Sequence, residues 1–464
     1  MAAKEMHKKN IHRCLGLALI VAVVGVAGSL FRPPAVVAVP SFARQTGMTC
    51  IACHTEFPIL TEYGRQFKIS GYTMGSGQTS LPPIAFMLLP GFTHTAKGQD
   101  GGAAPRFGDN NNFALGQASV FYAGRLFGPY TDNAFLNKFG TFFQATYNGV
   151  DRTFGWDNFE LRYADTATVG GKSLIYGFYL NNNPSMSDPW NTTPVWGFPF
   201  SSSPLAPTPA ASPLIAGGLA QQVAGLGAYV SISNTIYLEF AGYHTLGTGF
   251  QRAMGVNTDG QTQVPGVAPY WRLAYTKTIG NNSLMLGVYG LAAATYPGRD
   301  RTAGKDHIID FGFDAQWQAA FGKHGFTALA TLIYEKQQWN ASQQLELASN
   351  KSDHLWMTKL TIDYLYDSTV GGAIGYFNIN GNHDPSLYSG STQGSPLSDG
   401  LIFQLNYLPF NKKGGPSFWS KSNVKFSIQY VMYNRFDGAH SNYDGTGRNA
   451  RDNNTLYFEA WIAF

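Results

Sequence analysis

The chain has 464 residues, of which 13% are charged and 14% aromatic, and its formal net charge is +4. This composition excludes a disordered chain, which would carry more charge and fewer aromatic side chains. So small a positive excess gives no support to nucleic-acid binding, and the length fits several domains or one large β architecture.

The first 38 residues are typical of an export signal. A positively charged start, residues 4–13, precedes the apolar run 15–30, which has the length of a signal-peptide hydrophobic region. Cleavage is expected after Ala38, with cleavage after Ala27 as the alternative. A retained membrane anchor is the rival interpretation, but the run is short for a helix that crosses a membrane.

A C-x-x-C-H motif, formed by Cys50, Cys53 and His54, follows the expected signal. Two thiols at this spacing attach to the vinyl groups of one haem, and the next histidine is then placed on the iron. A thioredoxin-like pair would need a βαβ context, and a structural zinc site would need four ligands. The remaining cysteine, Cys14, lies in the signal, so a disulfide framework is excluded. The motif therefore predicts one covalently bound c-type haem.

The second axial ligand of that haem is less strongly specified. Methionine is a common partner for the histidine, and it raises the reduction potential. Met74 follows the motif by enough chain to reach over the ring, although a role in packing is the alternative. Met87, His94 or no protein ligand are the other interpretations.

Residues 39–80 are expected to form a small haem domain. The stretch 57–72 predicts a short helix that places four apolar side chains on one face against the haem; these are Phe57, Leu60, Tyr63 and Phe67. About forty residues bury little core on their own, so this domain should pack against something larger.

From residue 81 to 464 the pattern is that of β-strands with alternating apolar and polar side chains. In one segment Ile309, Phe311 and Phe313 alternate with Asp310 and Asp314. Strands are expected near residues 83–95, 113–127, 138–150, 156–168, 172–182, 222–232, 235–245, 268–279, 283–295, 307–320, 325–338, 353–367, 371–380, 400–410, 422–434 and 454–464.

The connections decide between a soluble sandwich and a membrane barrel, because alternation alone fits both. Connections after even-numbered strands are mostly tight, whereas those after odd-numbered strands are long. Two of the even connections, near 128–137 and 411–421, are longer than the rest. Short periplasmic turns and long external loops are typical of an outer-membrane barrel. We therefore expect an all-β transmembrane barrel of about sixteen antiparallel strands, with both ends on the periplasmic side and the haem domain as a helical plug.

The N-terminal motif region resembles the fused monohaem cytochrome–porins of the outer membrane in iron-oxidising bacteria. The matching positions are Phe42, Ala43, Arg44, Gln45, Thr46, Gly47, Cys50, Cys53, His54, Phe57, Pro58, Leu60, Gly64, Arg65, Phe67, Lys68, Gly71 and Tyr72. The resemblance implies an iron oxidase that takes electrons from extracellular Fe(II) and passes them to a periplasmic cytochrome or copper protein. In the barrel, this chain matches the family only in length and pattern.

Several polar residues could contact iron, since hard oxygen and nitrogen ligands suit it. The loop candidates are His383, Asp384, Asp437, His440 and Asp444. Their alternative is an ordinary role in solvated loops. A second set faces the lumen and is expected to form cross-strand pairs; its members are Glu160, Glu239, Asp310, Asp314, Asp363, Glu459, Arg162, Arg272, Lys359 and Lys425.

Two functions of different class remain open. One is the electron-transferring oxidase, and the other is a solute porin whose small haem domain serves a different donor or acceptor. A variant of the first carries electrons outward to an external acceptor. Conductance separates oxidase from porin, because a plugged barrel should pass few ions.

Overall fold

A computed structural model describes residues 41–75, 82–128, 131–416 and 422–464, and the predicted export signal lies outside these ranges. Residues Val39–Phe464 form one compact unit that contains both the motif region and the strands. Among the described residues, none of the helices combines the length and the apolar character needed to cross a membrane.

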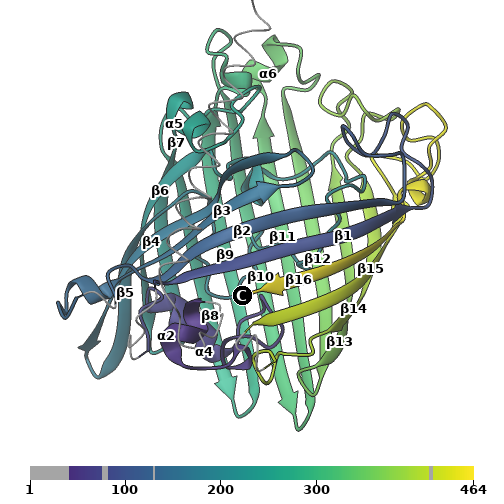
Figure 1. The fold of residues 1–464 in the computed structure, drawn as a ribbon. Helices are drawn as coiled ribbons and strands as arrows, with labels where there is room; N and C mark the ends of the chain where they lie inside the picture. The colour runs from purple at the N-terminus through teal and green to yellow at the C-terminus, as the bar shows by residue number, and fades with distance from the viewer. Residues whose placement is uncertain (1–40, 76–81, 129–130, 417–421) are drawn as a thin grey trace, which may run out of the picture. The chain divides into compact units, whose positions relative to one another are not determined.

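The dominant feature is a closed antiparallel barrel of sixteen strands, in which every strand pairs with its sequence neighbours and β1 closes on β16 (Figure 1). The strands are β1 (Ile84–Thr95), β2 (Asn112–Arg125), β3 (Phe139–Asn148), β4 (Thr153–Val169), β5 (Lys172–Asn181), β6 (Val223–Ile232), β7 (Ile236–Thr245), β8 (Ala268–Ile279), β9 (Asn282–Thr295), β10 (Asp306–Phe321), β11 (His324–Gln338), β12 (Ser352–Tyr366), β13 (Val370–Gly381), β14 (Ser398–Tyr407), β15 (Asn423–Arg435) and β16 (Thr455–Ala463). Each predicted strand overlaps one observed strand, so the predicted strand count and order are confirmed.

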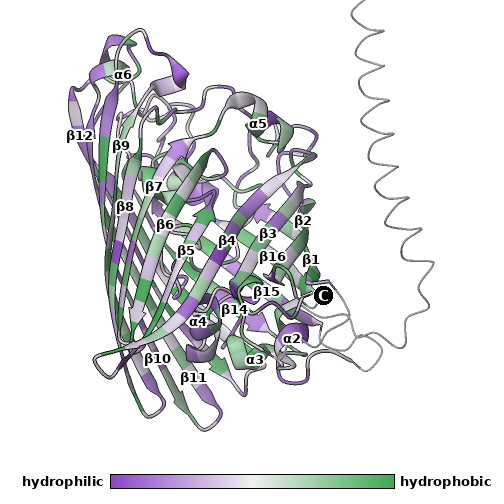
Figure 2. Cartoon of the chain, turned by 90° about the vertical axis from the view of Figure 1, so that its left-hand side faces the viewer, coloured by the Kyte–Doolittle hydropathy of each residue, from purple (hydrophilic) through white to green (hydrophobic). Residues whose placement is uncertain are grey.

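The apolar side chains of the strands point outward. On β10, Ile309, Phe311 and Phe313 are 38%, 53% and 41% exposed, whereas Asp310 and Asp314 are 1% and 0% exposed. Figure 2 shows the same alternation of hydrophobic and hydrophilic residues along neighbouring strands. A soluble sandwich would bury the apolar face, so this distribution is that of a barrel surrounded by lipid.

The connections alternate in length as the sequence predicted. Tight turns such as 170–171, 280–281 and 322–323 lie at one end, and long loops such as 182–222 and 436–454 lie at the other. Short turns mark the periplasmic end of outer-membrane barrels. The protein is an outer-membrane β-barrel. Its final strand, β16, ends at the periplasmic side beside the start of β1.

Three short helices lie near the periplasmic ends of the strands (Figure 1). They are α2 (Ser41–Thr46), α3 (Cys50–Cys53) and α4 (Glu62–Ile69). The predicted helix over 57–72 is therefore wrong in its first turns. The helix begins at Glu62 because the Thr61 hydroxyl caps it by accepting from Gly64 N, 3.2 Å away. Before it the chain makes a tight loop in which His54 and Leu60 form a β-bridge.

The face expected of that helix also changes. Phe57, Leu60 and Phe67 are buried, at 8%, 8% and 3% exposed, but Tyr63 is only partly buried. Phe57 belongs to the preceding loop and packs edge-on against Trp461 of β16, with ring centroids 5.3 Å apart. The apolar residues thus contact the barrel wall as well as one another.

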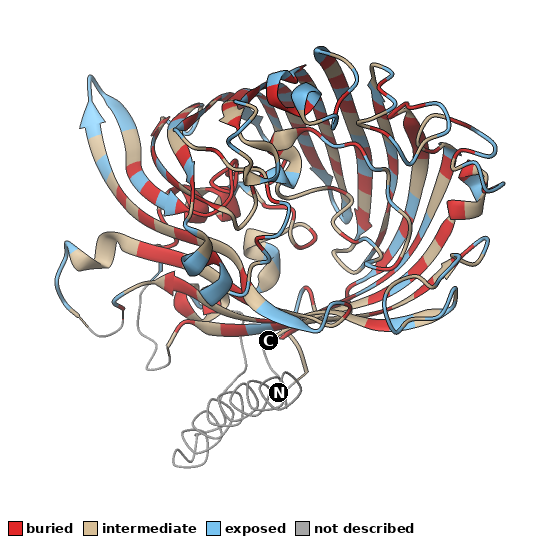
Figure 3. Ribbon diagram, turned by 90° about the horizontal axis from the view of Figure 1, so that it is seen from above, coloured by how far each residue is buried: buried red, intermediate tan, exposed pale blue. Residues whose placement is uncertain are grey.

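The extracellular connections contain short elements of their own. These are α5 (Thr248–Ala253), α6 (Asn340–Gln344), and one-turn segments at Leu214–Gly218, Pro297–Arg299 and Ala450–Asn453; Leu136–Lys138 lies in a periplasmic connection. The longest connection, 182–222 between β5 and β6, lies inside the barrel, where Thr192 O accepts from Thr331 of β11 at 2.7 Å and Ser201 donates to Glu459 of β16 at 2.6 Å. Figure 3, seen from above, shows chain inside the ring of strands. Ser185, Ser187 and Asp188 in it are 0% exposed. The loop is therefore packed within the lumen.

Candidate functional site

The C-x-x-C-H motif forms a single helical turn. Cys50 and Cys53 begin and end α3, and His54 follows as the C-terminal cap residue, whose N–H bonds to Cys50 O at 2.9 Å. The two cysteines are not joined by a disulfide and are partly buried. Burial raises the pKa of the Cys50 thiol, and it raises that of Cys53 to about 11. Burial therefore favours the neutral thiol form of both side chains.

His54 has the properties expected of a haem ligand. Burial lowers the pKa of its imidazole to about 4, against an opposing effect of the nearby backbone of Ile59 and Pro58. The ring is therefore neutral, which is the form that binds metals. Its Nδ1 is buried and makes no hydrogen bond of standard geometry within the described residues. A neutral imidazole next to two free thiols fits a haem held by Cys50, Cys53 and His54.

The chain after His54 is fixed to β14, β15 and the turn between them. Asn411 donates to Thr55 O at 3.2 Å, and Asn406 donates to Glu56 at 2.7 Å. Lys425 Nζ lies 3.4 Å from the Glu56 carboxylate, and both side chains are buried. The motif is thus attached to one sector of the barrel wall near its periplasmic end.

Helix α4 is fixed to the opposite wall. The Arg65 guanidinium donates to Gln318 at 2.6 Å, to Gln316 at 3.2 Å and to Ser283 at 3.2 Å, all on β9 and β10. Tyr229 of β6 donates to Ile69 O at 2.6 Å. Hydrogen bonds to charged groups are each worth about 1.5–3 kcal/mol, so these contacts hold α4 firmly across the lumen.

The segment after α4 returns to β2. Gln45 of α2 donates to Tyr72 O and Met74 O at 2.7 and 2.8 Å. Arg125 at the end of β2 donates to Thr73 O and Gly75 O, both at 2.7 Å. Residues 41–75 therefore follow the inner wall around the lumen, and we call them the plug.

The β5–β6 loop forms a second layer against the plug. Lys68 of α4 donates to Asp188 O at 2.6 Å, Met186 O at 3.0 Å and Asn191 Oδ1 at 3.1 Å. Its ammonium also lies 4.2 Å from the Trp196 ring centre. All three ammonium protons thus have acceptors, and the plug and the loop are joined by one buried cation.

Asp188 organises this loop and ties it to the barrel. Its carboxylate accepts from the backbone N–H groups of Trp190, Thr192 and Thr193 at 2.8–3.1 Å. It also lies 3.2 Å from Arg272 of β8, which holds Asp314 of β10 at 2.7 Å. Neither Lys68 nor Asp188 was identified as structural from the sequence, and only the unusual length of the connection pointed to this loop.

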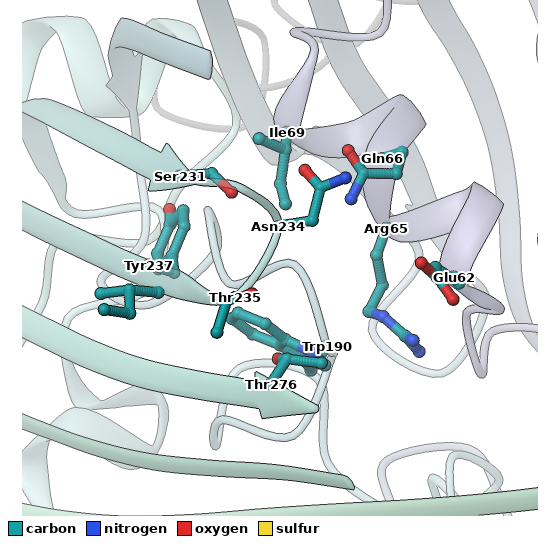
Figure 4. A pocket seen from close by; sticks show the side chains of 11 residues that line it. Glu62, Arg65, Gln66, Ile69, Trp190, Ser231, Asn234, Thr235, Tyr237 and Thr276 are labelled. Carbon is teal, nitrogen blue, oxygen red and sulfur yellow. The ribbon is translucent and has the colours of Figure 1, made fainter. Parts of the chain in front are cut away.

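Two cavities lie beside the plug and the β5–β6 loop. One cavity, of about 20 Å³, lies between α4 and the β6–β7 turn (Figure 4), where Glu62, Arg65 and Gln66 face Trp190 and Tyr237. A second, of about 80 Å³, lies along the β5–β6 loop beside Lys359. The first has room for about one water molecule, so neither cavity is a wide channel.

The predicted candidates for the distal haem ligand lie in different places. Met74 is partly buried at the β2 side of the plug. Met87 is 7% exposed and points into the lumen from β1, near its periplasmic start. His94 lies near the extracellular end of β1, where its Nδ1 is 2.8 Å from Asn111. Its position is at the far end of the strand from the plug.

The loop candidates for iron contacts are not gathered into one site. Asp384 is fully buried and accepts from four backbone N–H groups at 2.8–3.0 Å; the donors are Ser349, Asn350, Ser386 and Leu387.

The other loop candidates also have partners within or beside their own loops, or in a neighbouring one. The Asp437 carboxylate accepts from Ala210 N, and the Asp444 carboxylate accepts from Thr446 N and Arg448 N. His440 Nδ1 lies 2.7 Å from Asn434 O, and the backbone carbonyl of His383 accepts from Asn350 Nδ2 at 2.7 Å. No group of three or more His, Cys, Asp or Glu side chains in the described ranges is arranged to hold a metal.

The predicted lumen pairs form in part. Arg162 and Glu160 pair at 2.8 Å within β4, and Arg272 pairs with Asp314 two strands away. Glu239 and Arg272 are register partners on β7 and β8, but Glu239 accepts from tyrosines, including Tyr237 at 3.0 Å. The observed ion pairs therefore join residues of the same strand or of strands that are not adjacent. Long side chains make this possible, because they extend across the lumen-facing surface of the strand between them.

No protein-family profile and no curated protein matches the chain. Among solved structures it is similar to OmpT of Vibrio cholerae (9% identity, 82% of this chain and 96% of that chain, TM-score 0.41). It is also similar to the outer-membrane channel DcaP of Acinetobacter baumannii (11%, 82% and 96%, 0.45). A third is the anion-selective porin from Comamonas acidovorans (11%, 82% and 98%, 0.44).

Proposed function

We propose that this protein is an outer-membrane oxidase that takes electrons from extracellular Fe(II). One covalently attached c-type haem, held by Cys50, Cys53 and His54, would pass them to a periplasmic cytochrome or copper protein. The single observation that carries the proposal is the position of the C-x-x-C-H turn within a plug that is built into the lumen. A haem motif at that position serves transfer of electrons between the two sides of the membrane.

The chemistry required is one-electron transfer, in which Fe(II) becomes Fe(III) and the acceptor gains one electron. The haem would supply this redox chemistry when bound, so no nucleophile or acid–base pair is needed. The chain supplies position and insulation. Its thiols and His54 fix the cofactor, the buried contacts of Arg65 and Lys68 fix the plug, and the β5–β6 loop fills the lumen above it.

The position of the plug supports exchange of electrons with a periplasmic partner. The turn that carries Asn411 is periplasmic, and this residue bonds to the carbonyl next to His54. The site is therefore close to periplasmic partners. The membrane's apolar band is about 25 Å tall, so the lumen and its loop separate the site from the extracellular surface.

The rival function is a solute porin. It would need an open path, and the protein that fills the lumen argues against one. The Lys68 contacts and the small cavities in the described lumen support a closed barrel. Single-barrel conductance in a planar bilayer separates the two functions, since a porin of this strand count would conduct ions steadily.

The decisive experiment mixes oxidised, haem-loaded protein with Fe(II) under anaerobic conditions and follows reduction of the haem by absorbance. Reduction at the working pH is expected, as is transfer of the electron to an added periplasmic carrier. In intact cells, Fe(II) chelates too large for the lumen should also reduce the haem. A haem that stays oxidised with excess Fe(II), while dithionite reduces it, would contradict the oxidase proposal.

A further inference from the structure

We propose that Met87, on the first barrel strand, is the distal ligand of the haem iron. The inference rests on the proposed covalent haem at Cys50, Cys53 and His54. It assigns the ligand to the barrel wall instead of the plug. The argument uses the strand register, the burial of the side chain and the anchoring of the motif.

The first step is the anchoring of the motif to one row of the wall, by which we mean residues that are register partners on neighbouring strands. Asn411 donates to Thr55 O, next to His54, and Asn423 donates to Asn411 Oδ1 at 3.0 Å. Asn423 is 1% exposed. The haem-binding turn therefore lies against the lumen-facing start of β15.

The second step follows that row around the barrel. Asn423 of β15 pairs with Ala463 of β16, Ala463 pairs with Met87 of β1, and Met87 pairs with Ser119 of β2. Adjacent strands lie about 4.8 Å apart, so the Cα atoms of Asn423 and Met87 are roughly 10 Å apart along the wall. Met87 therefore lies two strands from the residue that anchors the motif, on the same row.

The third step is the direction of the Met87 side chain. Phe86 is 43% exposed toward lipid, whereas Met87 is 7% exposed and faces the lumen. Lipid and lumen faces alternate along a strand, so the sulfur points to the side on which the plug lies. A thioether is a known partner of histidine in c-type haems, and it raises the potential.

Met74 is the matched candidate within the plug. The carbonyl groups on either side of it, Thr73 O and Gly75 O, are bound by Arg125, and its own carbonyl accepts from Gln45 of α2 at 2.8 Å. Arg125 lies six residues beyond Ser119 on β2, which is roughly 20 Å at 3.3 Å per residue. Met74 is therefore held at the periplasmic end of β2, off the row that carries Met87.

The test compares Met87→Leu with the matched variant Met74→Leu, each isolated with haem attached. The ferric wild-type protein should show the sulfur-to-iron charge-transfer band of methionine ligation. Met87→Leu should lose this band, have a lower midpoint potential, and bind carbon monoxide readily in the ferrous state. Met74→Leu should retain the wild-type spectrum. Met87→His should give a six-coordinate, low-spin haem without the sulfur band.

Three results would each overturn the assignment: the band survives in Met87→Leu, it is lost in Met74→Leu, or it is absent from the wild type. Haem staining on denaturing gels and heat-dependent migration show that each variant is loaded and folded. If Met87→Leu fails to fold, Met87→His decides, because a wild-type spectrum in that variant would overturn the assignment. Reduction by Fe(II) is measured on the wild-type protein, whereas the ligand is assigned from the spectra of the variants, so the two proposals can fail or hold separately.

Discussion

Gly64 of α4 lies directly against the carbonyl oxygen of Cys53 of α3. A Cβ added at Gly64 would collide with Cys53 O and touch the Leu60 side chain at 3.0 Å. Glycine in a helix interior is otherwise unfavourable by about 0.5–1 kcal/mol relative to alanine. The close approach of the two helices therefore accounts for a glycine at this position.

Gly64→Ala should loosen the haem-binding turn while leaving the barrel intact. The collision involves backbone, which cannot move aside easily, so we expect a loss of about 1–3 kcal/mol in plug stability. Limited proteolysis should cut the plug faster, and less haem should be retained. Gly249→Ala in α5 is the matched control, because no atom lies within 4 Å of the added Cβ. Equal proteolysis of both variants would contradict this account.

Removal of both motif thiols should abolish covalent haem. In the double variant Cys50→Ala/Cys53→Ala, haem staining after denaturation and acid–acetone extraction should disappear. The barrel should still form, since its strands do not depend on the motif. Met48→Leu, an exposed neighbour of the turn, should retain full staining. Haem that stays on the double variant would sink the covalent assignment.

Lys68→Met should weaken the contact between the plug and the β5–β6 loop. The substitution leaves three buried oxygen acceptors without their donor, each costing about 1–3 kcal/mol. We expect flickering conductance in planar bilayers, where the wild type stays closed. Lys172→Met removes an exposed lysine at the periplasmic start of β5 and should behave as wild type. A closed Lys68→Met barrel would show that other contacts hold the loop.

Arg272→Met should destabilise the barrel strongly. It leaves Asp188 and Asp314 buried without their cation, and breaking such a pair costs about 3–5 kcal/mol. Arg272→Lys should recover only part of this, because lysine cannot bind Asp314 through two nitrogens. The temperature at which the folded band disappears on detergent gels measures the effect. Arg252→Met, at an exposed loop position, should leave that temperature unchanged.

Phe311→Lys tests the lipid-facing assignment of the outer surface. Phe311 is 53% exposed near the middle of β10. A lysine at the bilayer midplane should cost about 2–4 kcal/mol, whereas one near the interface costs about 0–1. Val267→Lys, 70% exposed just before β8, is the control for depth. Unfolding by denaturant in lipid vesicles gives both values, and equal losses would contradict a membrane-embedded Phe311.

The sequence alone determined the barrel. Alternation along segments such as residues 307–320 specified strands, because the side-chain period of a strand is two. The alternation of connection lengths then separated a membrane barrel from a sandwich. The adjacency of Cys50, Cys53 and His54 was sufficient to predict haem attachment, since that chemistry depends on local spacing.

Only the tertiary structure decided what fills the lumen. The start of α4 at Glu62 depends on the loop closed by His54 and Leu60, which helical periodicity could not reveal. The contact of Lys68 with the β5–β6 loop joins residues more than a hundred positions apart. The row that links Asn423 to Met87 exists because the barrel closes β16 onto β1. Such relationships depend on strand register, which no local pattern encodes, and the register places the candidate haem site against the wall.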